Sequence, residues 1–187
     1  MAMLINACGN VKPSQTFTRK NDKASLGDAA AAAAIYNKCV LESTATFETD
    51  PLSDAQMRAR MAEIIGRGFP YIAGEIGGEF AGFACAHPWR ERSAYERTLE
   101  TSVYVAEKFR GQGLGSELLG GLLERCEKLP NAHALVACIT SENLPSVRLH
   151  EKFGFRRVSD FREVGFKFGR YLGVSDFELL LPRGSAR

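Results

Sequence analysis

The residues best suited to chemistry lie around a glycine-rich turn in the middle of the chain. Residues 103–116 read Val-Tyr-Val-Ala-Glu-Lys-Phe-Arg-Gly-Gln-Gly-Leu-Gly-Ser, which predicts a strand, a loop with three alternating glycines, and the start of a helix. Glycine tolerates positive φ and leaves room for a ligand beside the backbone. The first N–H groups of a helix lack internal partners and, with the helix dipole, bind phosphate oxygens. The segment therefore predicts a phosphate-binding loop, with an unliganded glycine-rich turn as the alternative.

Two common phosphate-binding loops do not fit this segment. The dinucleotide-binding fingerprint requires glycine in its sixth place, where Ser116 follows Gly111 and Gly113. The P-loop requires a Gly-Lys-Ser or Gly-Lys-Thr triplet, which the sequence lacks.

A third pattern, Arg/Gln-x-x-Gly-x-Gly/Ala, does fit, with Arg110, Gly113 and Gly115 in its defining places. At this point the chain resembles the GNAT superfamily of acetyl-CoA-dependent N-acetyltransferases. Residues 143–155, which read Asn-x-x-Ser-x-x-x-His-Glu-Lys-x-Gly-Phe, are similar to the second motif of that superfamily. The two motifs occur in the expected order and separation, which makes the resemblance more specific than either motif alone.

The resemblance implies acetyl-CoA as co-substrate. In the superfamily the glycine loop holds the pyrophosphate of coenzyme A, and the preceding strand pairs with its pantetheine arm. Cofactor contacts are accordingly expected from the strand, the loop and the second motif: Val103, Tyr104, Val105, Arg110, Gly111, Gln112, Gly113, Leu114, Gly115, Ser116, Asn143 and Ser146.

Further stretches resemble the phosphinothricin N-acetyltransferase branch, whose members acetylate the α-amino group of glutamate-like or methionine-sulfoximine-like amino acids. The likeness runs from about Phe17 to Leu181 and is carried by residues 35–37, 43–49, 88–90, 94–95, 102–105, 146–148 and 162–167. The last third departs from it. Where the branch has Phe-Lys-His-Gly-x-Trp-His-Asp-Val-Gly, residues 166–175 read Phe-Lys-Phe-Gly-Arg-Tyr-Leu-Gly-Val-Ser. A different small amino acid or amine therefore stays open as the substrate.

Acetyl transfer to an amine requires a base for the ammonium proton, donors for the oxyanion and a stabilised leaving thiolate. Glu100 lies three residues before Val103, on the strand expected to flank the thioester. Partial burial there raises the pKa of a carboxylate toward the working range; a solvated strand carboxylate is the alternative. His150 stands where many superfamily members carry tyrosine, and roles as acid, base or pocket lining stay open. We predict Glu100 and His150 as the catalytic residues.

For the amino-acid substrate we predict contacts from Phe47, Arg92, Tyr95 and Lys167. Arg92 can bind a carboxylate in a bidentate way, and Tyr95 can form a wall of the pocket. The alternative for Arg92 is a place in a solvated basic face.

Hydrophobic spacing predicts the elements that position these residues. Apolar residues at three- and four-residue steps indicate helices over residues 29–40, from Ser53 to Gly66, and over 114–129, with a short helix over 145–153. Strands are expected over residues 16–20, 71–76, 79–86, 98–105, 134–139, 165–169 and 176–181. The fold class is therefore α/β: one GNAT-type domain over residues 16–182, with a mixed, mostly antiparallel sheet flanked by helices. A loose arm (1–15) precedes it and a polar tail (183–187) follows.

Local signals set several element boundaries. Asp28 is expected to cap the first helix, and Ser53 with Gln56 forms a capping-box pattern before the second. The two glycines 77–78 predict a hairpin turn, and Gly154 ends the short helix.

The composition of the 187 residues is ordinary for one globular domain: 45% are hydrophobic and 25% are charged. Lys and Arg number 24 and Asp and Glu 22, so a net charge of +2 provides no global field that attracts nucleic acid or a membrane surface. No apolar run is long enough to span a membrane. We expect a small-molecule amine as partner, and no nucleic acid or membrane; a homodimer is implied by the resemblance alone.

The five cysteines and three histidines have no metal-ligand spacing, so no metal is expected. The cysteines are scattered along the sequence, which indicates a reducing compartment, and the cytoplasm is the expected location. Cys85 and Cys138 lie in apolar stretches and are expected in the core.

Other functions remain open from sequence. One is acetylation of a peptide N-terminus or a lysine, which an open substrate groove would favour. Another is a non-catalytic acyl-CoA-binding domain, against which Glu100 and His150 argue. A nucleic-acid module is the weakest alternative because the charge is balanced.

Overall fold

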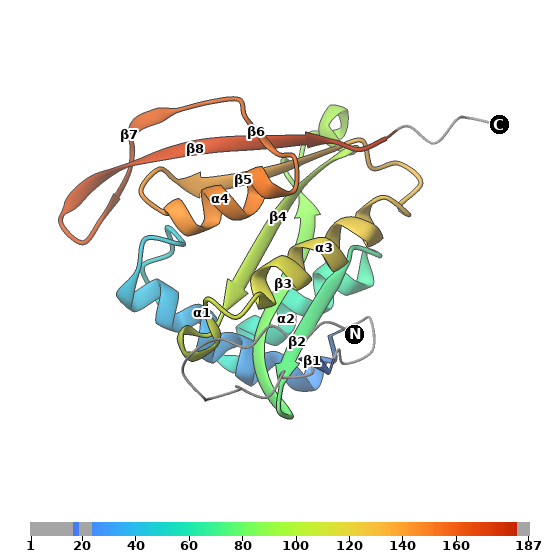
Figure 1. Cartoon of the computed structure of the whole chain (residues 1–187), viewed down its shortest axis with the longest axis vertical. Coiled ribbons are helices and arrows are strands. Elements are labelled where there is room, and N and C mark those ends of the chain that lie inside the picture. Colours follow the sequence, from blue (N-terminus) through green and yellow to red (C-terminus); the bar gives the residue numbers. More distant parts are fainter. Residues whose placement is uncertain (1–16, 19–23, 183–187) are drawn as a thin grey trace, which may run out of the picture.

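The fold is an open, mostly antiparallel sheet with helices on both faces, seen in a computed structural model that describes residues 17–18 and 24–182 (Figure 1). The strand order is β1-β2-β3-β4-β5-β8-β6, and β7 pairs with β8. The strands are β1 (Phe17–Thr18), β2 (Tyr71–Ile76), β3 (Glu79–Pro88), β4 (Thr98–Val105), β5 (Ala134–Thr140), β6 (Arg156–Arg157), β7 (Phe161–Lys167) and β8 (Arg170–Leu180). The helices are α1 (Ala29–Glu42), α2 (Asp54–Gly66), α3 (Leu114–Cys126) and α4 (Leu144–Lys152), with short 3₁₀ turns at Leu26–Asp28, Ser93–Tyr95 and Glu107–Phe109.

The sheet separates two hydrophobic cores. On one face α3 packs its leucines against alternate residues of β3, β4 and β5, and Val147 of α4 joins this core. On the other face α1 and α2 pack against β2 and β3, where Met57 and Met61 are fully buried. Alternation along the strands assigns Val103 and Val105 to the α3 face and Tyr104 to the α1–α2 face.

The sheet opens between its two central strands. β4 runs parallel to β5, and their register contains only the pairs from Thr98–Ala134 to Glu100–Val136. Beyond Glu100 the strands separate, as Figure 1 shows. Because each strand continues past this point, the separation exposes backbone and side chains of both strands at the centre of the molecule.

The first two helices begin at different kinds of cap. At α2 the capping box is confirmed, because the Gln56 N–H donates to Ser53 Oγ at 3.3 Å and the Ser53 N–H donates to Gln56 Oε1 at 2.8 Å. At α1 the expected cap residue is in the right position, but the expected hydrogen bond to its side chain is not made. Asp28 stands at the N-cap position without a side-chain cap bond to α1, and its carboxylate instead accepts from the Ser25 N–H at 2.8 Å. It thereby completes a capping box on the preceding 3₁₀ turn.

The third helix is shorter than its apolar spacing predicts. It ends at Cys126 rather than at Leu129. The next residues form tighter turns, in which the Lys128 N–H bonds to Arg125 O and the Leu129 N–H to Cys126 O. Pro130 follows directly, and proline disfavours helical conformation in the residue before it.

The C-terminal hairpin is longer than expected, and its turn lies elsewhere. Phe168 (φ 52°) and Gly169 (φ 72°) form the turn, so the glycines at 165 and 173 lie inside strands. Both mark close approaches: a Cβ at Gly173 would lie 2.8 Å from the Phe161 carbonyl oxygen, and one at Gly165 would overlap with the Phe47 ring. The sequence signal was therefore one of packing and not of a turn. The pair of residues in β6 was not expected at all.

Three other expectations have simple outcomes. The predicted strand over residues 16–20 is described only at Phe17 and Thr18, which pair with β2. The expected arm and tail lie outside the described residues. Gly154 (φ 87°) follows the last residues of α4 as predicted.

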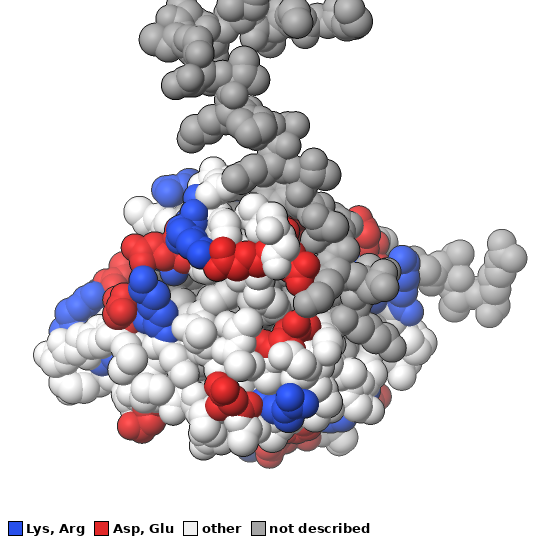
Figure 2. All heavy atoms as spheres, turned by 90° about the horizontal axis from the view of Figure 1, so that it is seen from below, with Lys and Arg blue, Asp and Glu red and all other residues white. Residues whose placement is uncertain are grey.

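Charged side chains are spread over the surface. Figure 2 shows lysine and arginine beside aspartate and glutamate over the face that it displays, with much uncharged surface between them. Within residues 17–18 and 24–182, no helix is both long and apolar enough to cross a membrane.

Candidate active site

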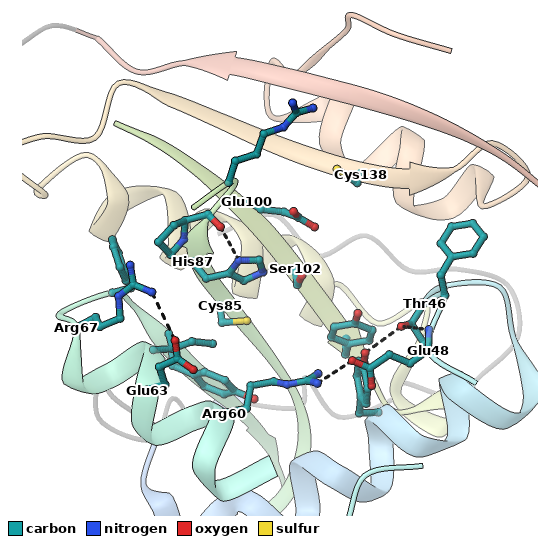
Figure 3. A pocket seen from close by; sticks show the side chains of 18 of the residues that line it. Thr46, Glu48, Arg60, Glu63, Arg67, Cys85, His87, Glu100, Ser102 and Cys138 are labelled. Carbon is teal, nitrogen blue, oxygen red and sulfur yellow. Dashed lines mark hydrogen bonds and ion pairs between the residues drawn. The ribbon is translucent and has the colours of Figure 1, made fainter. Parts of the chain in front are cut away.

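A cavity of about 970 Å³ opens on the α1–α2 side of the sheet, where β4 and β5 separate (Figure 3). Its walls come from the loop after α1, from α2, from strands β2 to β5 and β8, and from the segment between β3 and β4. Figure 3 shows Arg60, Glu63 and Arg67 approaching from α2, with Glu100 and Cys138 on the strands opposite. The cavity is large enough for an amino acid in front of the gap between the strands.

One wall is a row of residue pairs across β3 and β4. Antiparallel register places Phe83 opposite Tyr104, Cys85 opposite Ser102, and His87 opposite Glu100. All six residues line the cavity. At one end of the row the residues are aromatic, and the Phe83 and Tyr104 ring centroids lie 5.1 Å apart. At the other end, where β4 separates from β5, the pair is the titratable His87 and Glu100. Glu100 thus lines the cavity at the last residue pair before β4 and β5 separate.

The electrostatic setting of Glu100 suits a proton acceptor. Burial raises its pKa above the ordinary range, the positive charge of His87 opposes that rise, and Asp176 adds to it. A carboxylate with a raised pKa binds a proton more readily while remaining available in its ionised form.

The opposite wall comes from β5 and β8 and contains one correction. Cys138, expected in the core, is exposed and lines the cavity. It lies on β5 opposite Asp176 of β8, just beyond the last β4–β5 pair. It faces outward because the separation of the strands removes the neighbour that would cover it. Burial nevertheless raises the pKa of its thiol. Cys85 is buried as expected, and burial raises the pKa of its thiol to about 12.

Lys167 stabilises the loop after α1 through hydrogen bonds to its backbone. This side chain is 4% exposed, and its ammonium group donates to the carbonyl oxygens of Ser43 (2.9 Å) and Thr46 (2.8 Å). Burial lowers its pKa. Lys167 therefore supports the loop without lining the cavity, whereas Phe47, at the tip of the loop, lines it and rests on Gly165.

The segment between β3 and β4 provides the arginine predicted for the substrate. Arg92 is exposed and lines the cavity. Tyr95 lies outside the lining and packs edge-on against Trp89, with ring centroids 5.4 Å apart. Arg90 stacks on the same Trp89 ring at 4.1 Å. Tyr95 is thus placed to hold the segment that carries Arg92.

The glycine-rich turn forms an open cradle ahead of α3. Gly111 (φ 74°) and Gly113 (φ 89°) adopt left-handed conformations, and a Cβ at either would meet no atom within 4 Å. Two side chains fix the turn, since Arg110 Nε donates to Val105 O at 3.2 Å and Gln112 Nε2 donates to Lys108 O at 3.0 Å. The free space beside backbone N–H groups at a helix start fits phosphate oxygens.

Other predicted cofactor residues surround this cradle in different ways. Leu114 is buried in the core, so only its backbone faces the turn. Lys152 of α4 approaches Ser116 Oγ at 3.5 Å and adds a positive charge nearby. Asn143 caps α4 by accepting from the Ser146 N–H at 3.3 Å. None of these contacts fills the space beside Gly111 and Gly113, so an anionic group can reach the glycine cradle.

His150, in the last turn of α4, is buried and does not line the cavity. Its Nδ1 lies 2.9 Å from the Ser146 carbonyl oxygen, which only accepts, so the ring proton is on Nδ1. Its Nε2 is buried without a partner among the described residues. Burial lowers the pKa of His150, which makes the imidazole neutral near pH 7.

Sequence reasoning missed two parts of the site. His87 is not among the catalytic residues predicted from sequence, and only the β3–β4 register places it opposite Glu100. The second is an ion pair across the cavity, with Arg60 Nη2 2.7 Å from Glu48 Oε1. Its partners come from α2 and from the loop after α1, so sequence spacing alone does not bring them together.

Comparison with known proteins identifies the class. The sequence model of the Acetyltransferase (GNAT) family matches residues 33–155, which include β4, the glycine cradle, α3 and α4. The chain belongs to this family of acetyltransferases, whose co-substrate is acetyl-CoA, as the sequence analysis predicted.

Its relatives include enzymes of the predicted branch. The chain is 43% identical over 145 residues to phosphinothricin N-acetyltransferase of Alcaligenes faecalis, covering 78% of this chain and 74% of the relative. It is 36% identical over 165 residues to the L-methionine sulfoximine/L-methionine sulfone acetyltransferase of Pseudomonas aeruginosa, covering 87% and 95%. A phosphinothricin acetyltransferase from Sinorhizobium meliloti, solved in complex with acetyl-CoA, superposes with a TM-score of 0.86 at 34% identity and covers 92% of each chain.

Proposed function

We propose that this protein transfers the acetyl group of acetyl-CoA to the α-amino group of a small amino acid of the phosphinothricin or methionine sulfoximine type. The observation that carries the proposal is the position of Glu100, a carboxylate inside the cavity at the last residue pair before β4 and β5 separate. The names of the relatives support this class of substrate.

The proposed reaction uses Glu100 as the base. The carboxylate takes a proton from the ammonium group, directly or through water, and leaves the nitrogen lone pair free. Acetyl-CoA supplies the thioester carbonyl that this amine attacks. The N–C bond forms, the C–S bond breaks, and the nitrogen loses its second proton to the departing thiolate, so that the products are the amide and the free thiol of coenzyme A. The glycine cradle and Lys152 bind the phosphates of coenzyme A, at a distance from the reacting atoms.

For His150 we propose a role as hydrogen-bond acceptor. Its proton is engaged on Nδ1 and its depressed pKa keeps Nε2 unprotonated. A buried acceptor without a partner is costly, and binding of a donor next to it would remove that cost. This favours an acceptor over an acid that protonates the thiolate.

The proposal is tested by thiol release from acetyl-CoA in the presence of a panel of amines. The panel contains L-amino acids, phosphinothricin, methionine sulfoximine, a peptide with a free N-terminus and a lysine side-chain analogue. We expect acceleration by the free amino acids. Acceleration by the peptide or the lysine analogue alone would replace the substrate class. No acceleration by any amine, with acetyl-CoA still binding, would favour a binding domain.

Arg92 is proposed to bind the α-carboxylate of the acceptor. Replacing it by Gln removes the charged, bidentate contact, so we expect the KM of an amino acid to rise about 10- to 100-fold, since a charged hydrogen bond contributes about 1.5–3 kcal/mol. The matching amine without the carboxylate should be acetylated equally by both proteins. Arg97→Gln serves as the control, because Arg97 is exposed, lies outside the lining and pairs with Glu96. An equal loss with both acceptors would contradict the assignment.

The departure from the branch affects the cavity little. Of residues 171–173, Leu172 is buried, Tyr171 is 64% exposed, and Gly173 packs against the backbone of β7. None of the three lines the cavity, which begins at Val174 on this strand. The change therefore supports no switch of substrate by itself and instead alters the outer surface of the hairpin.

That outer surface supports the proposal of a homodimer. Val164 (63%), Phe166 (60%) and Tyr171 (64%) are exposed on the β7–β8 hairpin, and the Phe166 and Tyr171 rings contact each other at 5.1 Å. Exposed apolar clusters of this kind mark protein contacts. We expect sedimentation velocity to give a dimer that Phe166→Ser converts to monomers, while Leu41→Ser, at an exposed leucine of α1, keeps it. A monomeric unmodified protein would contradict the proposal.

The remaining proposals concern location and extent. The four described cysteines are free thiols, which supports a reducing compartment such as the cytoplasm. We propose that the acetyltransferase domain spans residues 16–182, with the arm and the tail outside it.

A further inference from the structure

His87, which the proposed reaction does not use, forms a pair with Glu100. They lie directly opposite each other in the antiparallel β3–β4 register, on the face that lines the cavity. Side chains that are opposite across antiparallel strands have Cβ atoms about 4.5–5.5 Å apart. Figure 3 shows both residues at the same end of the pocket, next to Ser102.

The hydrogen bonding of His87 fixes its tautomer. Its Nδ1 lies 3.1 Å from the carbonyl oxygen of Pro88, and since a carbonyl only accepts, the proton of the neutral ring is on Nδ1. The Nε2 lone pair is therefore available to receive a proton. The side chain is partly exposed, so a proton on it can pass to water at the mouth of the cavity.

Among the charged groups around the cavity, His87 is the one that favours the ionised form of Glu100. It is the one histidine among the residues that line the cavity. Charged or titratable groups that line the same cavity include Glu63 and Arg67 of α2, Cys85 of β3, Cys138 of β5, and Arg90, Glu91, Arg92 and Glu96 of the segment after β3. Asp176 of β8 lies opposite Cys138 in the β5–β8 register. Burial and Asp176 both raise the pKa of Glu100, and His87 lowers it, so His87 is the group that favours the ionised carboxylate.

We propose that His87 is a positioning residue for acetyl transfer: its neutral ring takes the substrate proton from Glu100 and, once charged, keeps the carboxylate ionised until the proton leaves to solvent. The proton moves from the ammonium nitrogen to the Glu100 carboxylate, then to His87 Nε2, and finally to water, which restores both groups. The proposal rests on the proposed function, in which Glu100 is the base.

The kinetic test compares His87→Gln with the unmodified protein over pH. Glutamine keeps a polar side chain but carries no charge, so Glu100 becomes harder to ionise. We expect the acid limb of kcat/KM for the acceptor to move about 1 unit to higher pH and kcat to fall, with the KM for acetyl-CoA unchanged. His133→Gln is the control because His133 lies outside the cavity lining. A purely structural role would lower activity equally at all pH values and would overturn the proposal.

Two further measurements keep the proposal separate from the proposed function. In the double variant His87→Gln/Glu100→Gln, activity should equal that of Glu100→Gln alone, and full additivity of the two losses would contradict a shared proton path. In an NMR titration, the ring signals of His87 should inflect where Glu100 titrates, and Glu100→Gln should abolish that inflection. This readout requires no turnover. If no amine is acetylated, the proposed function fails; if turnover occurs but the His87 profile and signals are unchanged, only this inference fails.

Discussion

Replacing Glu100 by Gln is expected to lower kcat/KM for the amine about 100-fold or more, because general base catalysis contributes about 10²–10⁴-fold. The loss should be greatest at pH values where Glu100 is ionised and the substrate amine is still protonated. Below the raised pKa of Glu100 the carboxylate is protonated in the unmodified protein too, so the two rates should converge there. A pH series of initial rates, with acetyl-CoA binding measured by calorimetry, checks both expectations.

Stability provides the control for this variant. Because burial raises the pKa of Glu100 in the folded state, its contribution to stability is present below the unfolded pKa and is lost as pH rises through the folded pKa. Glutamine carries no charge to bury, so Glu100→Gln should be at least as stable as the unmodified protein at pH 8. Reduced activity together with a raised or equal melting temperature separates catalysis from folding. Unchanged rates across the pH series would remove Glu100 from the reaction.

Replacing Gly113 by Val is expected to raise the KM for acetyl-CoA about 10- to 100-fold. The residue adopts φ 89°, which a β-branched side chain does not tolerate, and the new atoms would occupy the open space of the cradle. Loss of one charged hydrogen bond to a phosphate corresponds to about 1.5–3 kcal/mol, which accounts for this range. Calorimetric titration with coenzyme A measures the same loss without turnover.

Gly78→Val is the matched control, because Gly78 has φ 82° and equally open surroundings but lies in the turn between β2 and β3. Both variants should be destabilised by a similar amount, about 1–3 kcal/mol. Only the substitution at Gly113 should weaken binding of coenzyme A. Equal affinities in the two variants would show that the cradle does not hold the phosphates.

Much of this architecture is predictable because local signals agree with the tertiary structure. The capping box at Ser53 and the paired glycines between β2 and β3 match the elements that they predict, and the leucine spacing of α3 correctly predicts where that helix begins. The glycine cradle is predictable for the same reason, since its conformation depends on residues close in sequence. The fold class and the family followed from these segments.

The site is less predictable where contacts join distant parts of the chain. The pairing of His87 with Glu100 depends on the length and path of the segment between β3 and β4, which has no repeating pattern. Cys138 has the apolar neighbours of a core residue, and only the separation of β4 and β5 exposes it. Gly165 and Gly173 resemble turn residues, because a sequence does not distinguish a glycine needed for positive φ from one needed for close packing.

The contact between Gly165 and Phe47 has a consequence for the evolution of substrate range. The ring of Phe47 forms part of the cavity on one side and rests on the bare backbone of Gly165 on the other. A single methyl group at position 165 would overlap with that ring and force it to move, so the residue behind this wall affects the shape of the cavity. A lineage could therefore trade one acceptor for another by mutating a strand residue that never meets the ligand.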